Sequence, residues 1–253
     1  MTAEQDDNFL VRKIKSIGIW SINPYRGCAH RCVYCVARHQ GDAVPWFPKE
    51  EVISELRLRL TQVSRDTELF VGSLVDAYPA EEGQLKITRI ILKELSEQRR
   101  PFCIGTKSSL VCRDIDILQD HPVHCDVYLS LCSLQNDVLQ SLEPGAPSVL
   151  ERLNALSRLA EAGVDVNIDA APWIPGISNA EELIRKTPKN GKIQFAPLDT
   201  LVFGGTMKLM GTKYVQEEIN KAYLAERQRI GDLPGVWWKD PPAPNKPHRG
   251  DVQ

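Results

Sequence analysis

Six short apolar, β-prone runs alternate with helical runs along most of this 253-residue chain, and this alternation limits the fold more than any other feature. The runs between them carry apolar residues three and four positions apart, the spacing of amphipathic helices. Strands that alternate with helices predict a parallel β/α array, which right-handed crossovers curl into a barrel or partial barrel. The sequence therefore predicts an α/β fold with six strands, at residues 16–22, 68–73, 101–106, 125–131, 164–168 and 192–196.

Helix signals fall between these strands. Ser148, with Glu151 three residues later, matches a capping box, and Gly163 follows as a stop signal. The predicted helices cover residues 49–63, 84–98, 114–118, 148–162 and 214–229. The predicted organisation is an N-terminal extension (1–14), a core (15–200), a C-terminal helix region (201–231) and a tail (232–253).

The tail is predicted to be irregular because it has five prolines and no hydrophobic periodicity. Within it, Trp237 and Trp238 are adjacent, and we expect both indoles to pack back onto the core.

Net charge, hydropathy and cysteine content limit the partners and the cellular compartment that we expect for this chain. The net charge of −2 gives no global attraction to nucleic acid, and no apolar run approaches the roughly 18 residues of a membrane span. The N-terminus is acidic and polar, unlike a signal peptide. Seven cysteines, an odd number, argue against a disulfide framework. We expect a cytoplasmic protein without membrane partners.

Three of the cysteines, Cys28, Cys32 and Cys35, stand in a C-x3-C-x2-C pattern just after the first predicted strand. Chemistry in β/α barrels is located at the carboxyl ends of the strands, so this loop leaves the sheet at the active end. Three thiolates can hold three irons of a [4Fe–4S] cluster and leave the fourth iron open. A zinc site with His30 or His39 as fourth ligand, and three metal-free core cysteines, remain alternatives.

The stretch Asn23–Cys28, followed by Cys32-Val33-Tyr34-Cys35, resembles the radical S-adenosylmethionine (SAM) superfamily, and within it the spore photoproduct lyase-like branch. The resemblance covers roughly residues 15–200, with further matching stretches at 76–79, 106–108, 143–147 and 165–176. It implies a partial (β/α)6 barrel with a C-terminal extension. It also implies one [4Fe–4S] cluster and SAM, whose reductive cleavage gives a 5′-deoxyadenosyl radical that abstracts hydrogen from a substrate.

The resemblance assigns the cluster to the three cysteines of the motif and places Tyr34 beside the adenine of SAM. After the second strand, Gly72 and Ser73 match the segment that receives the SAM amino group, and Ser73 matches the serine of the lyase branch. Lys107 would pair with the SAM carboxylate, and Ser130 would bond its ribose. No catalytic side chain is assigned.

Several polar residues near these positions have open roles. Asn167 and Asp169 alternate along one predicted strand and its end, so both would line the pocket if that face points inward. Glu143 and Arg152 would either pair with each other or approach the cofactor. Asp76 would fix SAM or substrate, or be an inert turn residue.

The sequence also departs from the lyase pattern. Gly72 stands where those lyases carry a hydrogen-donor cysteine, and Val36 stands where they carry a relay tyrosine. We infer that the chain does not repair thymine dimers. The remaining cysteines are expected to be small core residues: Cys103, Cys112, Cys125 and Cys132.

By resemblance the electron donor is a flavodoxin or a ferredoxin, and the substrate is a nucleobase or nucleic acid. The alternatives are radical modification of a peptide or small metabolite, and a non-catalytic zinc or iron–sulfur module acting as a binding protein, carrier or sensor.

Overall fold

An eight-stranded sheet, ordered β1-β2-β5-β6-β7-β8-β9-β12, runs through the computed structural model, which describes residues 10–14, 18–35 and 41–242. The six predicted strands are confirmed as its six middle members, and all of them run parallel. They are β2 (Ile19–Ile22), β5 (Leu69–Val71), β6 (Phe102–Thr106), β7 (Cys125–Ser130), β8 (Val166–Trp173) and β9 (Ile193–Pro197). The predicted start of the first strand, residues 16–17, lies outside the described residues.

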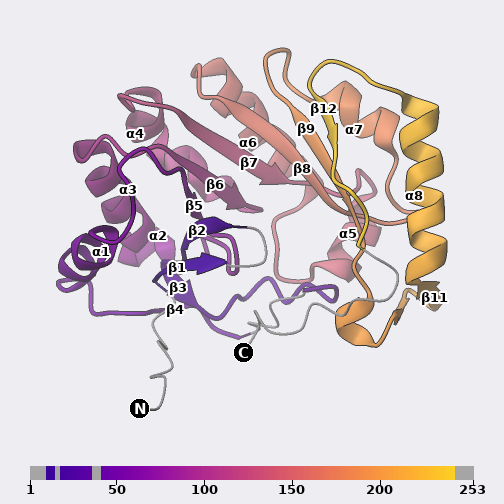
Figure 1. Cartoon of the computed structure of the whole chain (residues 1–253), viewed down its shortest axis with the longest axis horizontal. Coiled ribbons are helices and arrows are strands. Elements are labelled where there is room, and N and C mark those ends of the chain that lie inside the picture. Colours follow the sequence, from indigo (N-terminus) through magenta and orange to yellow (C-terminus); the bar gives the residue numbers. More distant parts are fainter. Residues whose placement is uncertain (1–9, 15–17, 36–40, 243–253) are drawn as a thin grey trace.

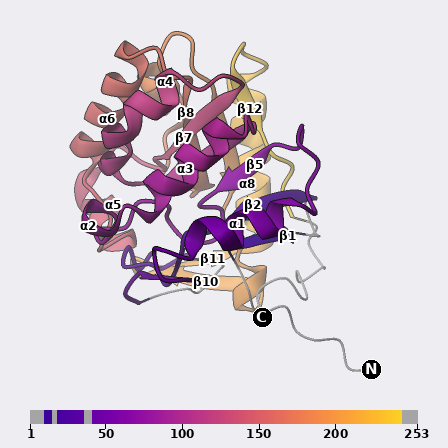
Figure 2. The same ribbon diagram turned by 90° about the vertical axis from the view of Figure 1, so that its left-hand side faces the viewer.

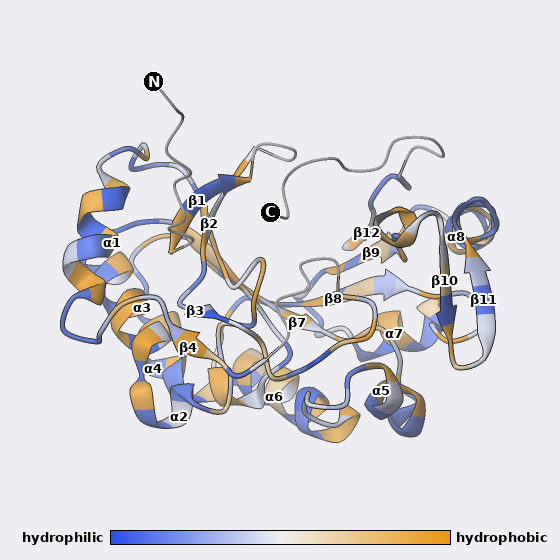
Figure 3. Cartoon of the chain, turned by 90° about the horizontal axis from the view of Figure 1, so that it is seen from below, coloured by the Kyte–Doolittle hydropathy of each residue, from blue (hydrophilic) through white to orange (hydrophobic). Residues whose placement is uncertain are grey.

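The strands form an open arc, and the helices cover its outer side (Figures 1 and 3). Figure 2 shows α1, α3, α4 and α6 along one face of the sheet, where their apolar sides build the main core. The result is the predicted α/β fold with a partial barrel. The helices that the sequence predicts are α1 (Val52–Leu60), α2 (Glu82–Leu85), α3 (Ile87–Glu97), α4 (Ile115–Gln119), α6 (Val149–Glu161) and α8 (Gln216–Ile230).

One predicted helix, at residues 84–98, is two helices instead. Lys86 adopts a left-handed conformation with φ +57° and separates α2 from α3. The buried Glu82 carboxylate explains the break, because it accepts hydrogen bonds from the backbone N–H groups of Thr88 (2.9 Å) and Arg89 (3.2 Å) at the start of α3. A carboxylate at this end of a helix satisfies amides that have no partner within the helix.

The tail is not irregular throughout, which corrects the prediction. β12 (Val236–Trp238) pairs parallel to β9 and ends the sheet. Trp238 stacks on Phe195 with ring centroids 4.5 Å apart, as expected, but Trp237 is 59% exposed, so the expectation for that indole was wrong. Residues 243–253 lie outside the described part of the chain.

Other elements were not predicted. β1 (Val11–Ile14) adds an antiparallel strand to β2 at the other edge. The others are the β3–β4 pair (Tyr25–Arg26 and Val44–Pro45), α5 (Asn136–Leu142), α7 (Ala180–Lys186), the β10–β11 hairpin (Thr206–Leu209 and Thr212–Val215), and the short 3-10 helices η1 (Ser109–Asp114) and η2 (Leu201–Phe203). Among the described helices, none combines the length and the apolar character that crossing a bilayer requires.

The capping box of α6 forms as predicted, with the Ser148 hydroxyl accepting from the Glu151 amide at 3.3 Å and the Glu151 carboxylate accepting from the Ser148 amide at 2.8 Å. We expect Ser148→Ala to lower the free energy of unfolding by about 1 kcal/mol, since the cap satisfies otherwise unpaired amides. Urea denaturation measures this change. Exposed Ser141→Ala on α5 is the control, and equal midpoints for the two variants would contradict the expectation.

Candidate active site

A cavity of about 430 Å³ opens at the carboxyl ends of the central strands. Because parallel strands end at the same edge of a sheet, residues far apart in the sequence meet there. The cavity brings together every site residue that the sequence predicted: Cys28, Cys32, Cys35, Tyr34, Gly72, Ser73, Lys107 and Ser130.

The loop that carries the cysteines is tied to the segment between α5 and α6. The Val33 amide donates to the Leu142 carbonyl at 2.9 Å, and the Gly145 amide donates to the His30 carbonyl at 3.0 Å. A Cβ atom at position 145 would lie 2.0 Å from the Ala29 carbonyl oxygen, so only glycine lets the two segments approach this closely. The cysteine loop is thus held by backbone contacts that involve no metal.

The donor set of this cavity fits an iron–sulfur cluster, because its three thiols, Cys28, Cys32 and Cys35, are soft ligands of the kind that hold one. His30 lines the same cavity, with Nδ1 3.4 Å from Asp76 Oδ2. A histidine held in this way can still bind a metal through Nε2, so the zinc alternative stays open. His39 lies outside the described residues.

Burial raises the pKa of both the Cys28 thiol and the Cys32 thiol, the latter to about 12. The Cys28 and Cys32 thiols without a metal are therefore neutral at pH 7. Because thiolates are the ligands, binding a cluster releases protons from these sulfurs, and loading is favoured as pH rises.

A buried network stands behind the cavity wall. Arg152 is fully buried and pairs with Glu143, whose carboxylate also accepts the Tyr34 hydroxyl. The same carboxylate lies 4.0 Å from Lys107 Nζ. Of the two alternatives for Glu143 and Arg152, the pairing is found, and Glu143 also contacts two of the residues predicted to hold SAM. An approach of either residue to the cofactor stays a prediction.

Asp76 fixes the strand end that presents Lys107. Its carboxylate accepts hydrogen bonds from the Thr106 hydroxyl (2.6 Å) and from the backbone amides of Tyr78 and Lys107 (both 2.8 Å). Burial alone would raise the pKa of Asp76, but the nearby His30 and these hydrogen bonds outweigh it and lower the pKa. Asp76 is therefore not an inert turn residue, because it positions backbone. It also lines the cavity, and its contact with SAM or substrate stays a prediction.

Ser73 already has a hydrogen-bond partner in the sheet. Its hydroxyl bonds the Ser21 hydroxyl, which in turn accepts from Asn23 Nδ2 at 2.9 Å. The Asn23 side-chain oxygen accepts a hydrogen bond from the Leu74 amide at 3.0 Å. The carboxyl ends of β2 and β5 are therefore hydrogen-bonded to each other. The geometry presents the Ser73 oxygen in a fixed place.

The far wall of the cavity comes from β8, β9 and the tail. Asp169 lines it and accepts from Gln194 Nε2 at 2.9 Å, whereas Asn167 accepts the Lys192 amide and is not part of the lining. Lys239 also lines the cavity. Sequence reasoning missed Lys239 because nothing periodic in the tail predicts the strand that delivers it.

All seven cysteines fall within the described residues, and none forms a disulfide. Cys103, Cys112, Cys125 and Cys132 are buried, as expected for core residues. Cys112 Sγ lies 3.6 Å from the Ala155 carbonyl oxygen and Cys125 Sγ lies 3.4 Å from that of Leu118.

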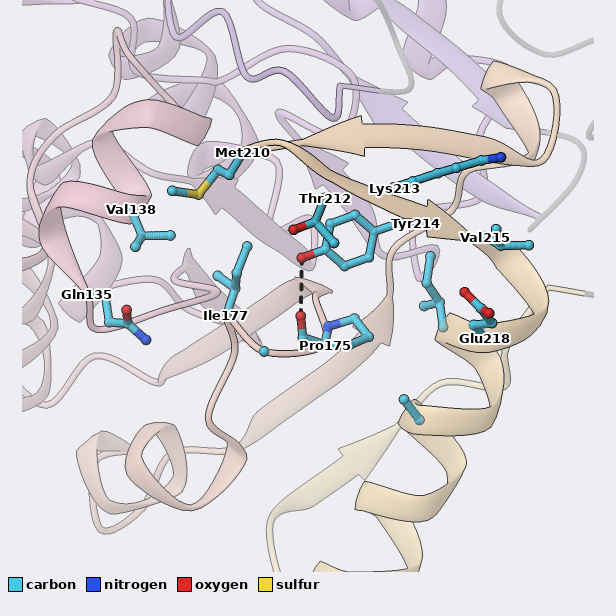
Figure 4. A pocket seen from close by; sticks show the side chains of 13 residues that line it. Gln135, Val138, Pro175, Ile177, Met210, Thr212, Lys213, Tyr214, Val215 and Glu218 are labelled. Atoms are coloured by element: carbon cyan, nitrogen blue, oxygen red, sulfur yellow. Dashed lines mark hydrogen bonds between the residues drawn. The ribbon is translucent and has the colours of Figure 1, made fainter.

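A second cavity, of about 660 Å³, lies between the β10–β11 hairpin, α8 and the loop after β8 (Figure 4). None of the predicted site residues lines it. The Tyr214 hydroxyl donates to the Pro175 carbonyl at 3.3 Å and ties the hairpin to the loop after β8. This hairpin also contributes Met207 and Leu209 to an apolar cluster that contains Cys32 and Tyr34.

The solved structures that resemble this fold include a spore photoproduct lyase and SuiB. A spore photoproduct lyase variant with bound AdoMet and dinucleoside spore photoproduct superposes with a TM-score of 0.64 at 15% identity, over 92% of this chain and 79% of the lyase chain. Streptococcus suis SuiB bound to precursor peptide SuiA gives 0.60 at 16% identity, over 87% of this chain and 48% of SuiB. At such identities the likeness shows a shared fold alone.

Sequence relatives include an uncharacterized protein of Methanocaldococcus jannaschii, 31% identical over 172 residues (66% of this chain, 64% of the relative). Another is an uncharacterized protein of Mycobacterium tuberculosis, 28% identical over 176 residues (64% of this chain, 52% of the relative). The chain therefore spans between half and two thirds of the length of these curated relatives. The family profile of the radical SAM superfamily matches residues 22–187, more than half of the chain. The chain belongs to the radical SAM superfamily.

Proposed function

We propose that this chain is a radical SAM enzyme in which Cys28, Cys32 and Cys35 hold a [4Fe–4S] cluster and the cavity beside them binds SAM. One observation carries the proposal: the cysteines and the residues expected to hold SAM line one cavity. When bound and reduced, the cluster supplies the electron that cleaves SAM to methionine and a 5′-deoxyadenosyl radical.

Each residue that is expected to bind SAM has a proposed role. Ser73 receives the SAM amino group beside Gly72, and Lys107 pairs with the carboxylate as a compact point charge. Tyr34 lies against the adenine, and Ser130 bonds the ribose. The contacts of Glu143 support these roles, because one buried carboxylate holds both the Tyr34 hydroxyl and the Lys107 ammonium in place.

The protein positions the cofactor and the substrate and shields them from water. Holding the reacting groups in one orientation removes much of the entropy cost of their encounter, and the cofactor supplies the chemistry. We propose that a flavodoxin or ferredoxin delivers the electron. None of the seven cysteines forms a disulfide, which supports a reducing compartment, in keeping with the cytoplasm.

The proposed substrate is a nucleobase or nucleic acid, with a peptide or small metabolite as the alternative. The structural neighbours do not decide between them, since one is described with a dinucleoside and the other with a precursor peptide. Fold likeness alone does not assign a substrate. Gly72, in the place of the donor cysteine, supports a reaction other than thymine-dimer repair.

The test is anaerobic reconstitution with iron and sulfide, followed by dithionite and SAM, with 5′-deoxyadenosine quantified by chromatography. We expect 5′-deoxyadenosine from the reconstituted protein and none above background from Cys32→Ala. Losing one of three cluster ligands removes the cluster, so the variant should also lack the charge-transfer absorption of the wild type.

A fully loaded [4Fe–4S] protein that yields no 5′-deoxyadenosine would sink the enzymatic proposal and favour a carrier or sensor. One zinc per chain with no labile sulfide would favour a zinc module instead.

A further inference from the structure

β12 lies outside the segment that the superfamily profile matches, yet the residue that follows it, Lys239, lines the cavity. In its register with β9, Trp237 is opposite Gln194 and Trp238 is opposite Phe195. Partners on neighbouring strands point to the same side of a sheet. Gln194 bonds the cavity residue Asp169, so Trp237 lies on the inner side of the arc, and Lys239, two residues later, shares that side.

The outer side of the same strand is fixed by α8. Tyr223 packs against Trp238 with ring centroids 5.2 Å apart. Its hydroxyl donates to the carbonyls of Phe195 (2.7 Å) and Lys239 (3.0 Å). The Lys239 amide donates to the Phe195 carbonyl at 2.9 Å. Contacts with α8 and β9 therefore fix the backbone of Trp237 and Lys239 from the outer side of the sheet.

Lys239 offers a cation to the cavity. Burial raises the pKa of Asp169, and Lys239 is the strongest of the charges that oppose this rise. Within the described residues, the Lys239 ammonium has no carboxylate within 4 Å, whereas Lys107 lies beside Glu143. Lys239 is therefore available to an anionic group of a ligand.

Trp237 offers a flat apolar surface two residues before that cation in the chain. Its indole is 59% exposed, and Lys192 Nζ lies 5.6 Å from the ring centroid. An exposed aromatic ring among lysines is how proteins that bind single-stranded nucleic acid stack a base while neutralising phosphate. Neither side chain is needed to pack the core, since Trp238 and Phe195 do that on the other side.

We propose that β12 is the substrate-recognition strand of this enzyme and that it takes a nucleotide unit of a single-stranded nucleic acid, with a base on Trp237 and a phosphate on Lys239. The proposal rests on the proposed function for the chemistry that follows binding, and it names the substrate class for that cavity. A peptide could instead pair with the free backbone edge of β12, but that mode would depend little on these two side chains.

The experiment titrates the reconstituted full chain into fluorescein-labelled oligodeoxythymidylate and follows fluorescence anisotropy. The variants are Trp237→Ala and Lys239→Gln. The matched controls are Leu233→Ala, which removes another exposed apolar side chain of the same tail, and Lys208→Gln, which removes an exposed charge of the β10–β11 hairpin.

We expect Trp237→Ala to weaken binding at least fivefold, the lower end of what one stacked base contributes. Lys239→Gln should reduce the slope of log affinity against log salt by about 0.7, as for one lost phosphate contact on a single strand. Both controls should bind as the wild type does.

No binding by the wild type, or equal binding by all four variants, would overturn the proposal. So would an unlabelled polyglutamate peptide that competes as well as unlabelled oligonucleotide, because charge alone would then account for the binding. The two proposals fail separately: oligonucleotide binding without 5′-deoxyadenosine formation contradicts only the enzyme, and 5′-deoxyadenosine formation without binding contradicts only this recognition strand.

Discussion

Replacing Gly72 with cysteine is expected to lower the free energy of unfolding by roughly 2–6 kcal/mol. Two independent causes add up. Gly72 has φ +84°, a left-handed conformation that costs other residues about 1–3 kcal/mol. A Cβ atom there would also lie 2.7 Å from the Gly105 carbonyl oxygen and 2.9 Å from the Ala77 Cβ, and overpacking costs a further 1–3 kcal/mol or so.

This expectation bears on the lyase resemblance, which places a hydrogen-donor cysteine at that position. A side chain at this strand end would be crowded and strained, so restoring the donor by one substitution is expected to cost stability. The absence of the donor cysteine is therefore consistent with the backbone conformation at Gly72.

Urea denaturation measures the loss. Gly83→Cys is the matched control, because Gly83 lies in α2 with no heavy atom within 4 Å of a built Cβ and without a positive φ. We expect that control to be neutral or slightly stabilising. A Gly72→Cys protein with the wild-type midpoint would show that the strand end relaxes without cost.

Arg152→Met is expected to cost about 3–5 kcal/mol, the penalty for leaving a buried carboxylate without its partner. Arg152 is fully buried and bonds more than Glu143: Nη1 donates to the Ser130 carbonyl at 3.0 Å, and Nε donates to the Pro147 carbonyl at 2.9 Å. Removing the guanidinium leaves all three acceptors short of a donor.

A double-mutant cycle isolates the pair. Glu143→Leu added to Arg152→Met should cost much less than the sum of the two single changes, because no charge is then left buried alone. Arg158→Met on the exposed side of α6 is the control, and we expect it to stay within about 0.5 kcal/mol of the wild type. Additive single changes would mean that the two groups do not act as a pair.

The sheet was predictable because each parallel strand is a short apolar run bounded by turn residues. The same logic failed at the edges. β12 has only three residues, two of them indoles between glycine and charged residues, and its pairing with β9 depends on tertiary contacts with Tyr223 rather than on local pattern. The Lys86 break escaped detection because an apolar periodicity continues across it, while its cause, the Glu82 carboxylate, is a buried polar contact.

The membership of the site was predictable for the same topological reason: residues just after parallel strands meet at one edge. What a sequence does not reveal is which polar groups already satisfy one another. The pairing of Glu143 with Arg152, and the role of Asp76 as a holder of backbone, required the structure. The roles of the site residues stay predictions: cluster ligation by Cys28, Cys32 and Cys35, and SAM binding by Tyr34, Gly72, Ser73, Lys107 and Ser130. The division of the chain after residues 14, 200 and 231 also stays a prediction.

The contact between Gly145 and the cysteine loop has a consequence for the life of the cofactor. Since the loop is ordered by backbone hydrogen bonds to the Leu142 carbonyl and the Gly145 amide, much of the entropy cost of arranging three ligands is met when the chain folds. Loss of a cluster to oxygen would then leave a preformed receptor rather than a collapsed loop. The same polypeptide could then take up a new cluster after each loss.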